Sequence, residues 1–459
     1  MSADIPVHES KPKRGLGNPR SFKINPGEDR GMMDGKPYPI PKQWTESSIG
    51  KIVVKAKQRD PRKKPDETFQ YVDVSSVSNE SFKITSATPT IGSEAPSRAR
   101  KAIETDDVLF ATVRPTLKRI ALVPQKHDGA IASTGYCVLR CDKAKADPGF
   151  VYFFLITDHF NARMAGLERG ASYPAVRDSD VKDSWLPLPP IPEQKKIAHI
   201  LSMVQRAIEA QERIIQNTTE LKKALMHKLF TEGLRGEPQK QTEIGLVPET
   251  WDVVPLEQIA ESFQYGTSVK CGYDVRGKAV LRIPNVVGGA VDISDLKFGK
   301  PKPNEIDNLR LQLGDLLFVR TNGVKGNAGR CSMFEGEVED CYFASYLIRV
   351  RLDPSKMNPT FLNEYSRTET GSSFLSGKSI RTADGKFNIN SGMLKTMFVP
   401  VPAIGEQKEI ASALALIDAK FSSARTKKTV LQDLFRSLLH ELMTAKTRVK
   451  GIELPPGES

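Results

Sequence analysis

Several loops of this 459-residue chain combine arginine, lysine and asparagine with small polar and aromatic residues. Arginine can form two hydrogen bonds with guanine, asparagine can form two with adenine, and basic side chains bind phosphates. As a set, these loops are candidate contacts with nucleic acid, although any one such residue is more often structural or solvated. The candidates in the first half are Arg98, Arg100, Lys101, Arg114, Lys118, Arg119, Arg169, Ser172, Tyr173 and Arg177. The candidates in the second half are Arg320, Thr321, Asn322, Lys325, Asn327, Lys378, Arg381, Lys386 and Asn388.

The overall charge favours the same kind of partner. The chain has 67 lysine and arginine residues against 55 aspartate and glutamate residues, which gives a formal net charge of +12. An excess of this size favours a polyanionic partner, and nucleic acid is the commonest one.

Cysteine, histidine and apolar residues are placed in a way that argues against several other classes. The five cysteines form no CxxC pair and the six histidines have no HxxxH or HExxH spacing, so we expect neither a disulfide framework nor a metal site. No window approaches the roughly 18 uninterrupted apolar residues of a membrane span. The N-terminal stretch MSADIPVHESKPKRG lacks the apolar core of a signal peptide. We therefore expect a cytoplasmic protein that does not associate with membranes.

The known motifs for chemistry on nucleic acids are missing. The chain has no NPP[YF]-type motif, no glycine-rich loop after a strand that would hold AdoMet or a dinucleotide, and no GxxxxGK[ST] loop for ATP. Acidic pairs such as Asp106 and Asp107 are more often turn residues than catalytic ones. We therefore expect a non-catalytic chain that holds no cofactor and no metal.

The chain contains an internal duplication at a constant offset of 213 residues. Thirteen of the 43 positions in residues 187–229 are identical in residues 400–442, which is several times the chance expectation. Weaker matches precede each copy. These are Pro41 and Trp44 with Pro248 and Trp251, and Asp107, Leu109 and Phe110 with Asp315, Leu317 and Phe318. The two repeats match at their ends and differ in the sequence between, which indicates two modules with the same function and different targets.

Both copies of the duplicated segment predict a long helix. Glu193 or Glu406 in the first turn complements the helix dipole, and no proline or glycine follows that turn. Apolar residues at heptad spacing favour a coiled-coil seam, and the simplest partner of one helix is the other. The alternative is that each helix packs only on its own domain. The predicted seam residues are Ile197, Leu201, Val204, Ile208, Ile215, Leu225, Leu229, Ile410, Leu414, Ile417, Phe421, Leu431, Phe435, Leu438 and Leu442.

The two variable regions predict an α+β fold. Stretches such as YVDVSS, VLFATV, YCVLRC, AVLRIP, DLLFVR and SYLIRVRL are typical of strands, and FVYFFLITDHFNARM and PTFLNEYSRTET are typical of helices. We expect two α/β domains separated by two long antiparallel coiled-coil helices, related by a pseudo-twofold repeat. The predicted segments are 1–38, basic and of a composition that favours disorder; 39–186, the first domain; 187–236, the central helical region; 237–399, a linker and the second domain; 400–446, the second helical region; and 447–459, a tail.

Over nearly its whole length the chain resembles the specificity (S) subunit of type I restriction–modification systems. The resemblance rests on the helix starts PLPPIPEQKKI and VPVPAIGEQKEI and on the turn GDLLFVRTN at residues 314–322. The first half departs from that turn with TDDVLFATVR at residues 105–114. The resemblance implies two target-recognition domains that each read one half of a bipartite site in double-stranded DNA, and helices that set the spacer between the halves.

The resemblance also implies partners. Two methyltransferase (M) subunits carrying AdoMet would dock on the helices, and restriction (R) subunits would use ATP and Mg²⁺. Two other interpretations remain open from the residues alone. One is a coiled-coil scaffold with two protein-binding modules that does not bind DNA, and the other is a self-sufficient methyltransferase or nuclease with unrecognised motifs.

Overall fold

The computed structural model describes residues 32–33, 36–37, 41–449 and 453 and contains two compact units. Unit 1 consists of residues 1–210 and 428–459, and unit 2 consists of residues 211–427. The predicted disorder of segment 1–38 lies outside the described residues, except for the paired strands β1 (Met32–Met33) and β2 (Lys36–Pro37).

The module of unit 1 is built on two four-stranded sheets. One sheet has the order β4-β11-β8-β9, and the other has the order β6-β5-β10-β7, in which β5 and β10 run parallel. A separate antiparallel pair, β3 with β12, joins the start of the module to the strand that leads into the long helix. The bounds are β3 Thr45–Ser48, β4 Val53–Val54, β5 Thr68–Val72, β6 Thr88–Ile91, β7 Ala99–Ala102, β8 Val108–Ala111, β9 Ile120–Leu122, β10 Ile131–Ser133, β11 Tyr136–Cys141 and β12 Trp185–Leu188.

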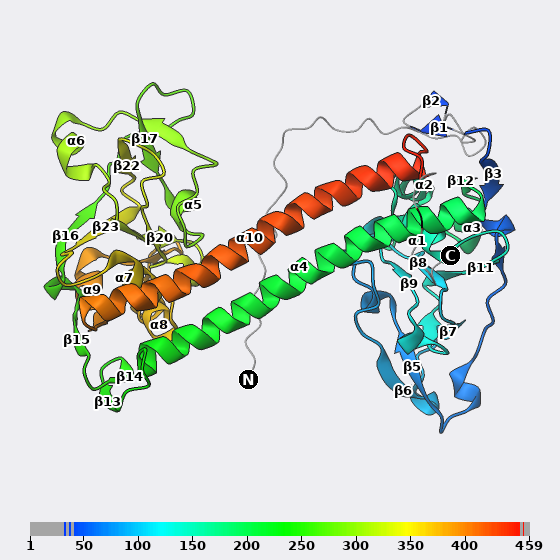
Figure 1. Cartoon of the computed structure of the whole chain (residues 1–459), viewed down its shortest axis with the longest axis horizontal. Helices are drawn as coiled ribbons and strands as arrows, with labels where there is room; N and C mark the ends of the chain where they lie inside the picture. The colour runs from blue at the N-terminus through cyan, green and yellow to red at the C-terminus, as the bar shows by residue number, and fades with distance from the viewer. Residues whose placement is uncertain (1–31, 34–35, 38–40, 450–452, 454–459) are drawn as a thin grey trace. The chain divides into compact units, whose positions relative to one another are not determined.

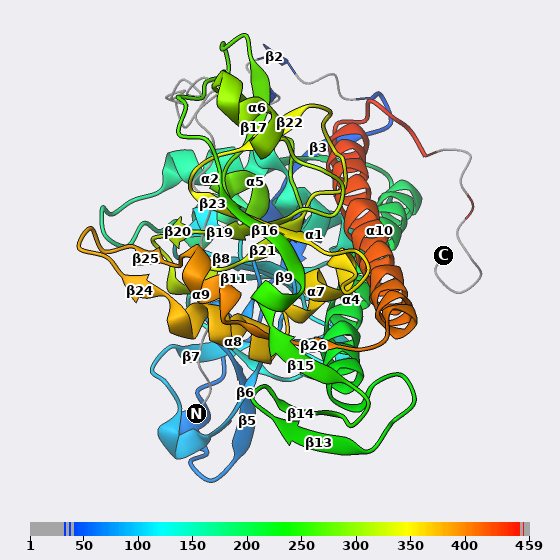
Figure 2. The ribbon, with the colours of Figure 1, turned by 90° about the vertical axis from the view of Figure 1, so that its left-hand side faces the viewer.

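Unit 2 repeats part of this plan. Its four-stranded sheet β16-β23-β19-β21 corresponds to β4-β11-β8-β9, and its pair β15 with β26 corresponds to β3 with β12. Two three-stranded sheets, β18-β17-β22 and β20-β25-β24, and the hairpin β13-β14 complete it (Figure 2). The bounds are β13 Gln239–Thr242, β14 Gly245–Pro248, β15 Asp252–Pro255, β16 Ala260–Tyr265, β17 Lys278–Leu281, β18 Lys297–Gly299, β19 Leu316–Val319, β20 Thr321–Asn322, β21 Cys331–Met333, β22 Cys341–Phe343, β23 Leu347–Leu352, β24 Ile380–Arg381, β25 Phe387–Asn388 and β26 Phe398–Val401.

Four of the six predicted strands are confirmed, whereas YVDVSS is a strand only at residues 71–72 and AVLRIP only at residues 279–281, because a helical turn follows each. Each of the two predicted module helices is divided into two. Thr157 both ends the first helix of its pair and caps the second, whereas in the other pair Ser366 ends the first helix and Thr368 caps the second. The two threonine hydroxyl groups accept from the backbone N–H groups of Phe160 and Gly371. The helix bounds are α1 Pro148–Ile156, α2 Asp158–Leu167, α3 Asp178–Lys182, α4 Ile191–Glu232, α5 Ile283–Val286, α6 Pro303–Leu309, α7 Pro359–Tyr365, α8 Glu369–Lys378, α9 Ser391–Lys395 and α10 Ile404–Met443.

The two long helices, α4 with 42 residues and α10 with 40, run antiparallel within each unit (Figure 1). In unit 1 the start of α4 and the end of α10 share one hydrophobic core with α1. In unit 2 the end of α4 and the start of α10 share a core with α7. Of the predicted seam residues, the buried ones are Ile197, Leu201, Leu229, Ile410, Leu414 and Leu442. The half-buried ones are Val204, Ile208, Ile215, Leu225, Ile417, Phe421, Leu431, Phe435 and Leu438.

A buried glutamine at the start of each long helix ties that helix to its module. Gln194 accepts from the backbone N–H of Asp147 at 2.8 Å and donates to the carbonyls of Lys145 and Pro189. Gln407 accepts from the backbone N–H of Asn358 at 2.7 Å and donates to the carbonyls of Lys356 and Pro402. Both glutamines have a relative exposure of 0%. The duplicated glutamine is therefore a structural joint, because it satisfies backbone groups that would otherwise be buried without partners.

The duplicated glutamate does more than complement the helix dipole. Glu193 and Glu406 accept a hydrogen bond, each at 3.1 Å, from the indole nitrogens of Trp44 and Trp251 respectively. This contact explains why Pro-x-x-Trp recurs together with the helix start. The tryptophan lies at the beginning of each module in the chain and contacts the long helix that follows the module. Sequence reasoning found both motifs but did not connect them.

Each glutamate also receives the chain that leaves the other long helix. In unit 1 the guanidinium of Arg448, beyond the end of α10, bonds to Glu193 at 2.7 and 2.9 Å. In unit 2 the backbone N–H of Leu234, beyond the end of α4, donates to Glu406 at 3.3 Å. The two units thus use the same kind of closure, which gives the repeat a pseudo-cyclic order of module, helix, module, helix.

The described residues contain no helix long and apolar enough to cross a membrane. All five cysteines are unpaired. Burial raises the pKa of Cys137, Cys141, Cys331 and Cys341 to about 12, so these thiols stay protonated at neutral pH.

Replacing Gln407 with alanine tests the structural joint. The change leaves a backbone N–H and two carbonyls without their side-chain partner, so we expect Gln407→Ala to lower the free energy of unfolding by about 1–3 kcal/mol. The urea unfolding midpoint of the full chain measures the loss. Gln432→Ala, at an exposed position of α10, is the matched control and should change stability by less than about 0.5 kcal/mol. Equal effects of the two changes would contradict the assignment.

Candidate nucleic-acid interface

In unit 1 the predicted loops around residues 114 and 173 lie against each other. The backbone N–H of Arg114 donates to the carbonyl of Pro174 at 2.7 Å, and Val113 forms an isolated β-bridge with Ala175. The Arg114 guanidinium lies 5.2 Å from the ring centroid of Tyr173, whose relative exposure is 73%. Arg114 adopts a left-handed backbone conformation with φ of 49°. The loops therefore present a stacked arginine and tyrosine to solvent.

Unit 2 contains a comparable arrangement after the corresponding strand. Arg320 follows β19, and its guanidinium lies 4.9 Å from the ring centroid of Tyr265. Strand β20 pairs with β25, and the N–H of Ile389 donates to the carbonyl of Arg320 at 2.9 Å, so the predicted loops 320–327 and 378–390 also come together. The exposed Tyr346 lies beside them and accepts from the N–H of Arg320 through its carbonyl at 2.9 Å.

A buried ion pair holds the strand beneath each stack. Asp107 and Asp315, each 1% exposed, bind Arg140 and Arg351 through two hydrogen bonds of 2.7–2.9 Å. Each aspartate also accepts a backbone N–H from the turn before its strand, β8 or β19. These carboxylates are thus fully used in positioning the strand, in agreement with the expectation that Asp107 is a turn residue.

Several predicted basic residues are engaged inside their own unit. The ion pairs are Arg100–Asp60, Lys101–Asp178, Lys118–Asp158, Arg169–Asp180 and Lys386–Asp384. Hydrogen bonding to the Lys386 ammonium lowers the pKa of Asp384 to about 2. Arg119 donates to the carbonyls of Ser75 and Val77. An exposed ion pair stabilises a protein by only about 0–1 kcal/mol. These pairs therefore do not prevent the basic residues from binding phosphate, but each phosphate contact would have to replace an existing ion pair.

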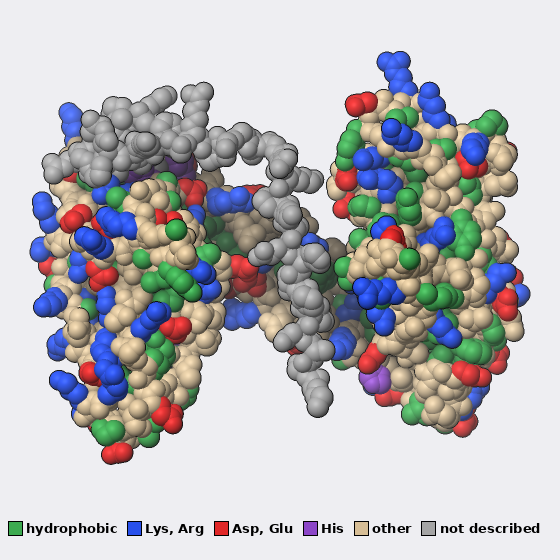
Figure 3. Space-filling model, turned by 180° about the vertical axis from the view of Figure 1, so that it is seen from behind, with side chains coloured by type: hydrophobic (Ala, Val, Ile, Leu, Met, Phe, Trp, Pro, Cys, Tyr) green, Lys and Arg blue, Asp and Glu red, His purple; other side chains and the backbone are tan. Residues whose placement is uncertain are grey.

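Other predicted basic residues keep their charge exposed, without an ion pair among the described residues. These are Arg98, Arg114, Arg177, Lys325, Lys378 and Arg381. The Lys378 ammonium lies 5.8 Å from the ring centroid of Phe374. Figure 3 shows basic side chains spread over the visible face of each module and interspersed with acidic ones, so charge alone marks no single patch in that view. The stacked arginines are better markers, because their side chains are already held in place.

The predicted polar residues differ in how available they are. Ser172 is exposed, whereas Thr321 and Asn327 are half-buried. The side chain of Asn322 accepts from the N–H of Val324 at 2.9 Å and thus caps its own loop. The side-chain oxygen of Asn388 is buried without a hydrogen-bond partner. Sequence reasoning missed Tyr265 and Tyr346, although an aromatic residue at a strand end before glycine, as in FQYG, is a signal that could have found Tyr265.

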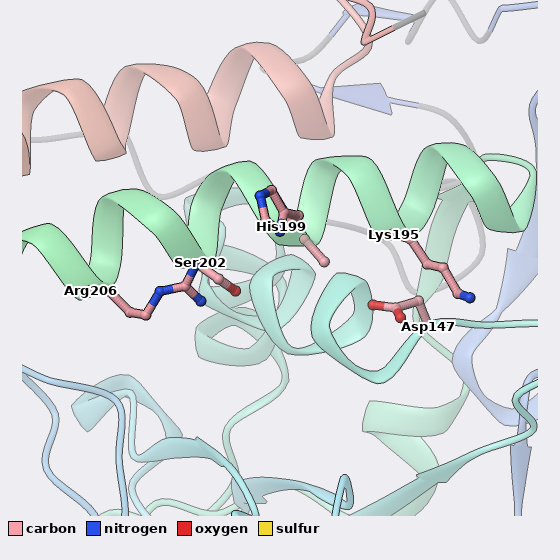
Figure 4. Close-up of a pocket in the computed structure, with 6 residues that line it drawn as sticks. Asp147, Lys195, His199, Ser202 and Arg206 are labelled. Carbon is pink, nitrogen blue, oxygen red and sulfur yellow. The ribbon is translucent and has the colours of Figure 1, made fainter. Parts of the chain in front are cut away.

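A shallow depression opens beside the first turns of α4 in unit 1 (Figure 4). It is lined by Asp147 at the start of α1 and by five residues of α4, namely Lys195, Ala198, His199, Ser202 and Arg206. Burial raises the pKa of Asp147. The equivalent positions of α10 are Lys408, Ala411, Ser412, Ala415 and Ala419, so most of the basic character is not duplicated. A partner that binds both halves alike would not use this depression. No group of three or more potential metal ligands occurs among the described residues.

Comparisons with known proteins agree with these features. Residues 41–219 match the model of the type I restriction modification DNA specificity domain. The chain is 27% identical over 327 residues to the type I restriction enzyme MjaVIII specificity subunit of Methanocaldococcus jannaschii, covering 71% of this chain and 76% of that one. It is 23% identical over 369 residues to the EcoKI specificity subunit of Escherichia coli, covering 78% and 79%.

A solved structure extends the likeness to the fold. The type I restriction–modification S subunit from M. genitalium matches with a TM-score of 0.58 at 15% identity, over 92% of this chain and 98% of that one. The matching domain model and these relatives make the chain similar to type I restriction–modification specificity subunits over most of its length.

Proposed function

We propose that each module reads one half of a bipartite site in double-stranded DNA. The observation that carries the proposal is the stacked arginine and tyrosine at the end of the same supported strand in each module, Arg114 with Tyr173 and Arg320 with Tyr265. An arginine held on an aromatic ring is partly ordered before it binds, so it loses less side-chain entropy when it contacts a base edge or a phosphate. The surrounding loops differ between modules, which would give each half-site its own sequence.

The long helices would act as spacer and as docking platform. At about 1.5 Å per residue, α4 is on the order of 60 Å long. Exposed apolar residues occur at equivalent positions of both helices, 213 residues apart: Met203 (52% exposed) with Leu416 (74%), and Leu221 (58%) with Leu434 (44%). A surface that is present twice suits two copies of one partner, and we infer that this partner is the methyltransferase (M) subunit.

The chemistry would then belong to the partners. In this proposal the chain is non-catalytic and holds no cofactor, the M subunits carry AdoMet, and restriction (R) subunits use ATP and Mg²⁺. The supporting features are the absence of cofactor-binding motifs from the sequence and the full use of Asp107 and Asp315 in positioning. A protein that reads chromosomal DNA would act where that DNA is held, which here would be the cytoplasm.

Module exchange tests the proposal directly. Replacing residues 247–399 with the module of another S subunit should change one half of the recognised sequence and leave the other half and the spacer unaltered. Sequencing of methylated sites in cells that carry the matching M subunit gives both halves. A change in both halves, or in neither, would contradict the two-reader model, and an absence of sequence-dependent methylation would favour the scaffold interpretation.

The stacked arginine should matter more for DNA binding than a neighbouring paired lysine. We expect Arg320→Ala to weaken specific binding by the complex with M subunits about ten- to a hundredfold, because a lost bidentate base contact costs roughly 1–3 kcal/mol. Lys386→Ala removes a charge that Asp384 already pairs and should weaken binding less than about threefold, which corresponds to a surface pair. Fluorescence anisotropy with a cognate duplex measures both. Equal losses for the two variants would contradict the role given to the stack.

Loss of one exposed apolar position should remove one M subunit. A charge in a docking surface cannot be desolvated without cost, so we expect Leu416→Asp or Met203→Asp to reduce the stoichiometry from two M subunits per chain to one. The double variant should bind none. Native mass spectrometry of the purified complex measures the ratio, with Ser422→Asp at an exposed polar position of α10 as control. Retention of two M subunits by the double variant would contradict this docking surface.

A further inference from the structure

In unit 2 one lysine of α4 lies between carboxylates of the module and of α10. The ammonium of Lys222 is 2.8 Å from a carboxylate oxygen of Glu364 on α7 and 2.7 Å from one of Asp418 on α10. The Glu364 side chain is 5% exposed and the Lys222 side chain 18%. The pair is therefore largely withdrawn from water.

The ionic contact continues into the module. The other oxygen of Glu364 binds the guanidinium of Arg367 at 2.7 Å, and Arg367 donates to the carbonyl of Gly289. A carboxylate this buried depends on its cationic partners, since a buried charge that loses its partner is strongly destabilising. Unit 2 therefore favours a helix end that supplies a second cation at this position.

The equivalent positions of unit 1 are identified by the repeat itself. At the offset of 213 residues, Phe435 of α10 is the equivalent of Lys222 of α4, and Asp418 of α10 is the equivalent of Gln205 of α4. Asp147 and Asn358 bind the equivalent glutamines, and six residues beyond them stand Phe153 and Glu364. The same three structural positions are thus occupied by Phe153, Phe435 and Gln205 in unit 1.

Unit 1 uses an uncharged contact at these positions. The rings of Phe153 and Phe435 lie 6.0 Å apart between centroids, and Phe153 is 1% exposed. Gln205 donates to the carbonyl of Ser81 at 3.1 Å. An aromatic pair in one unit therefore stands where the other unit has an ion pair.

The two ends of the hydrophobic seam do not choose between pairings. Their residues are repeated, as in Ile197 with Ile410, Leu201 with Leu414, and Leu229 with Leu442, whereas the middle of the seam differs, as in Ile215 with Lys428. Two copies of the chain could therefore pair α4 with α4 and α10 with α10 and keep these end contacts. In the first pair Lys222 would meet Phe153 and Gln205 in place of Glu364 and Asp418. In the second pair Phe435 would take the place of Lys222, and Glu364 would keep Arg367 as its cationic partner.

We propose that these three positions form an orthogonal pairing code that joins each module to the correct helix ends and excludes symmetric association with a second copy of the chain. The code consists of Phe153, Gln205 and Phe435 in unit 1 and of Glu364, Asp418 and Lys222 in unit 2. Both symmetric pairings separate Lys222 from Glu364 and Asp418, so a largely buried ion pair is lost, whereas pairing α4 with α10 keeps both sets of contacts. The proposal concerns which halves join and is independent of the DNA sequence that the modules read.

A fourfold variant reverses the code without changing the amino-acid composition. Phe153→Glu and Gln205→Asp, combined with Glu364→Phe and Asp418→Gln, make each half complementary to itself, because Lys222 and Phe435 stay in place. We expect this variant of the full chain to form dimers in which α4 pairs with α4. Light scattering after size-exclusion chromatography measures the mass, and the wild-type chain should be monomeric under the same conditions.

Cross-linking identifies the pairing in the dimer. If residue 205 of one copy stands opposite residue 222 of the other, residues 213 and 214, which lie midway, face their own counterparts. Ile214→Cys in a Cys271→Ser background should therefore cross-link between copies with a short bismaleimide in the fourfold variant and not in the wild-type chain. The other four native cysteines are buried and should not react.

A sixfold variant is the matched control. Adding Lys222→Phe and Phe435→Lys to the fourfold variant exchanges the two codes completely and restores complementarity between α4 and α10. We expect it to be monomeric and free of the cross-link. If the fourfold variant unfolds instead of dimerising, the proposal still predicts that the sixfold variant has a higher melting temperature than the fourfold variant. A fourfold variant that stays monomeric and stable, or a sixfold variant that is no more monomeric and no more stable than the fourfold one, would overturn the proposal.

Discussion

Each module is joined to a long helix by one glutamine that has no access to solvent. Gln194 and Gln407 satisfy a backbone N–H at the start of a module helix and a carbonyl just before the long helix. Because buried backbone groups must find partners, the glutamine sets where the module helix stands on the long helix. The core contacts, the tryptophan–glutamate contact and the closure by the chain that leaves the other helix all follow from this placement.

The residues that join each module to its long helix are the same in both units, whereas the exposed loops of the modules differ. Joints such as Trp44 with Glu193 and Trp251 with Glu406 have the same geometry in both units, because the same packing problem is solved twice. The loops that carry Arg114 and Arg320 differ in length, partners and local structure, yet each ends a strand that a buried aspartate supports. A protein that must read two unrelated half-sites needs this combination of constant supports and variable loops.

Duplication also creates a hazard. Two similar helices can pair correctly within one chain or symmetrically with a second copy, and the repeated ends of the seam fit either pairing. The difference between an ion pair at Lys222 and Glu364 and an aromatic pair at Phe153 and Phe435 breaks that equivalence. Charged residues suit this purpose because an unpaired buried charge penalises the wrong partner more than a paired one stabilises the right one.

The sequence by itself determined the duplication, the two long helices and the central strands of each module, such as those in YCVLRC and SYLIRVRL, since these depend on identities at a fixed offset and on local composition. It could not separate α1 from α2, because the division depends on whether the hydroxyl of Thr157 caps a helix. Only the tertiary structure decided which predicted basic residues keep a free charge. Lys101 and Asp178 are 77 residues apart, and Lys222 and Asp418 are 196 apart. No sequence pattern reveals ion pairs between residues so far apart in the chain, because only the tertiary fold brings the two side chains together.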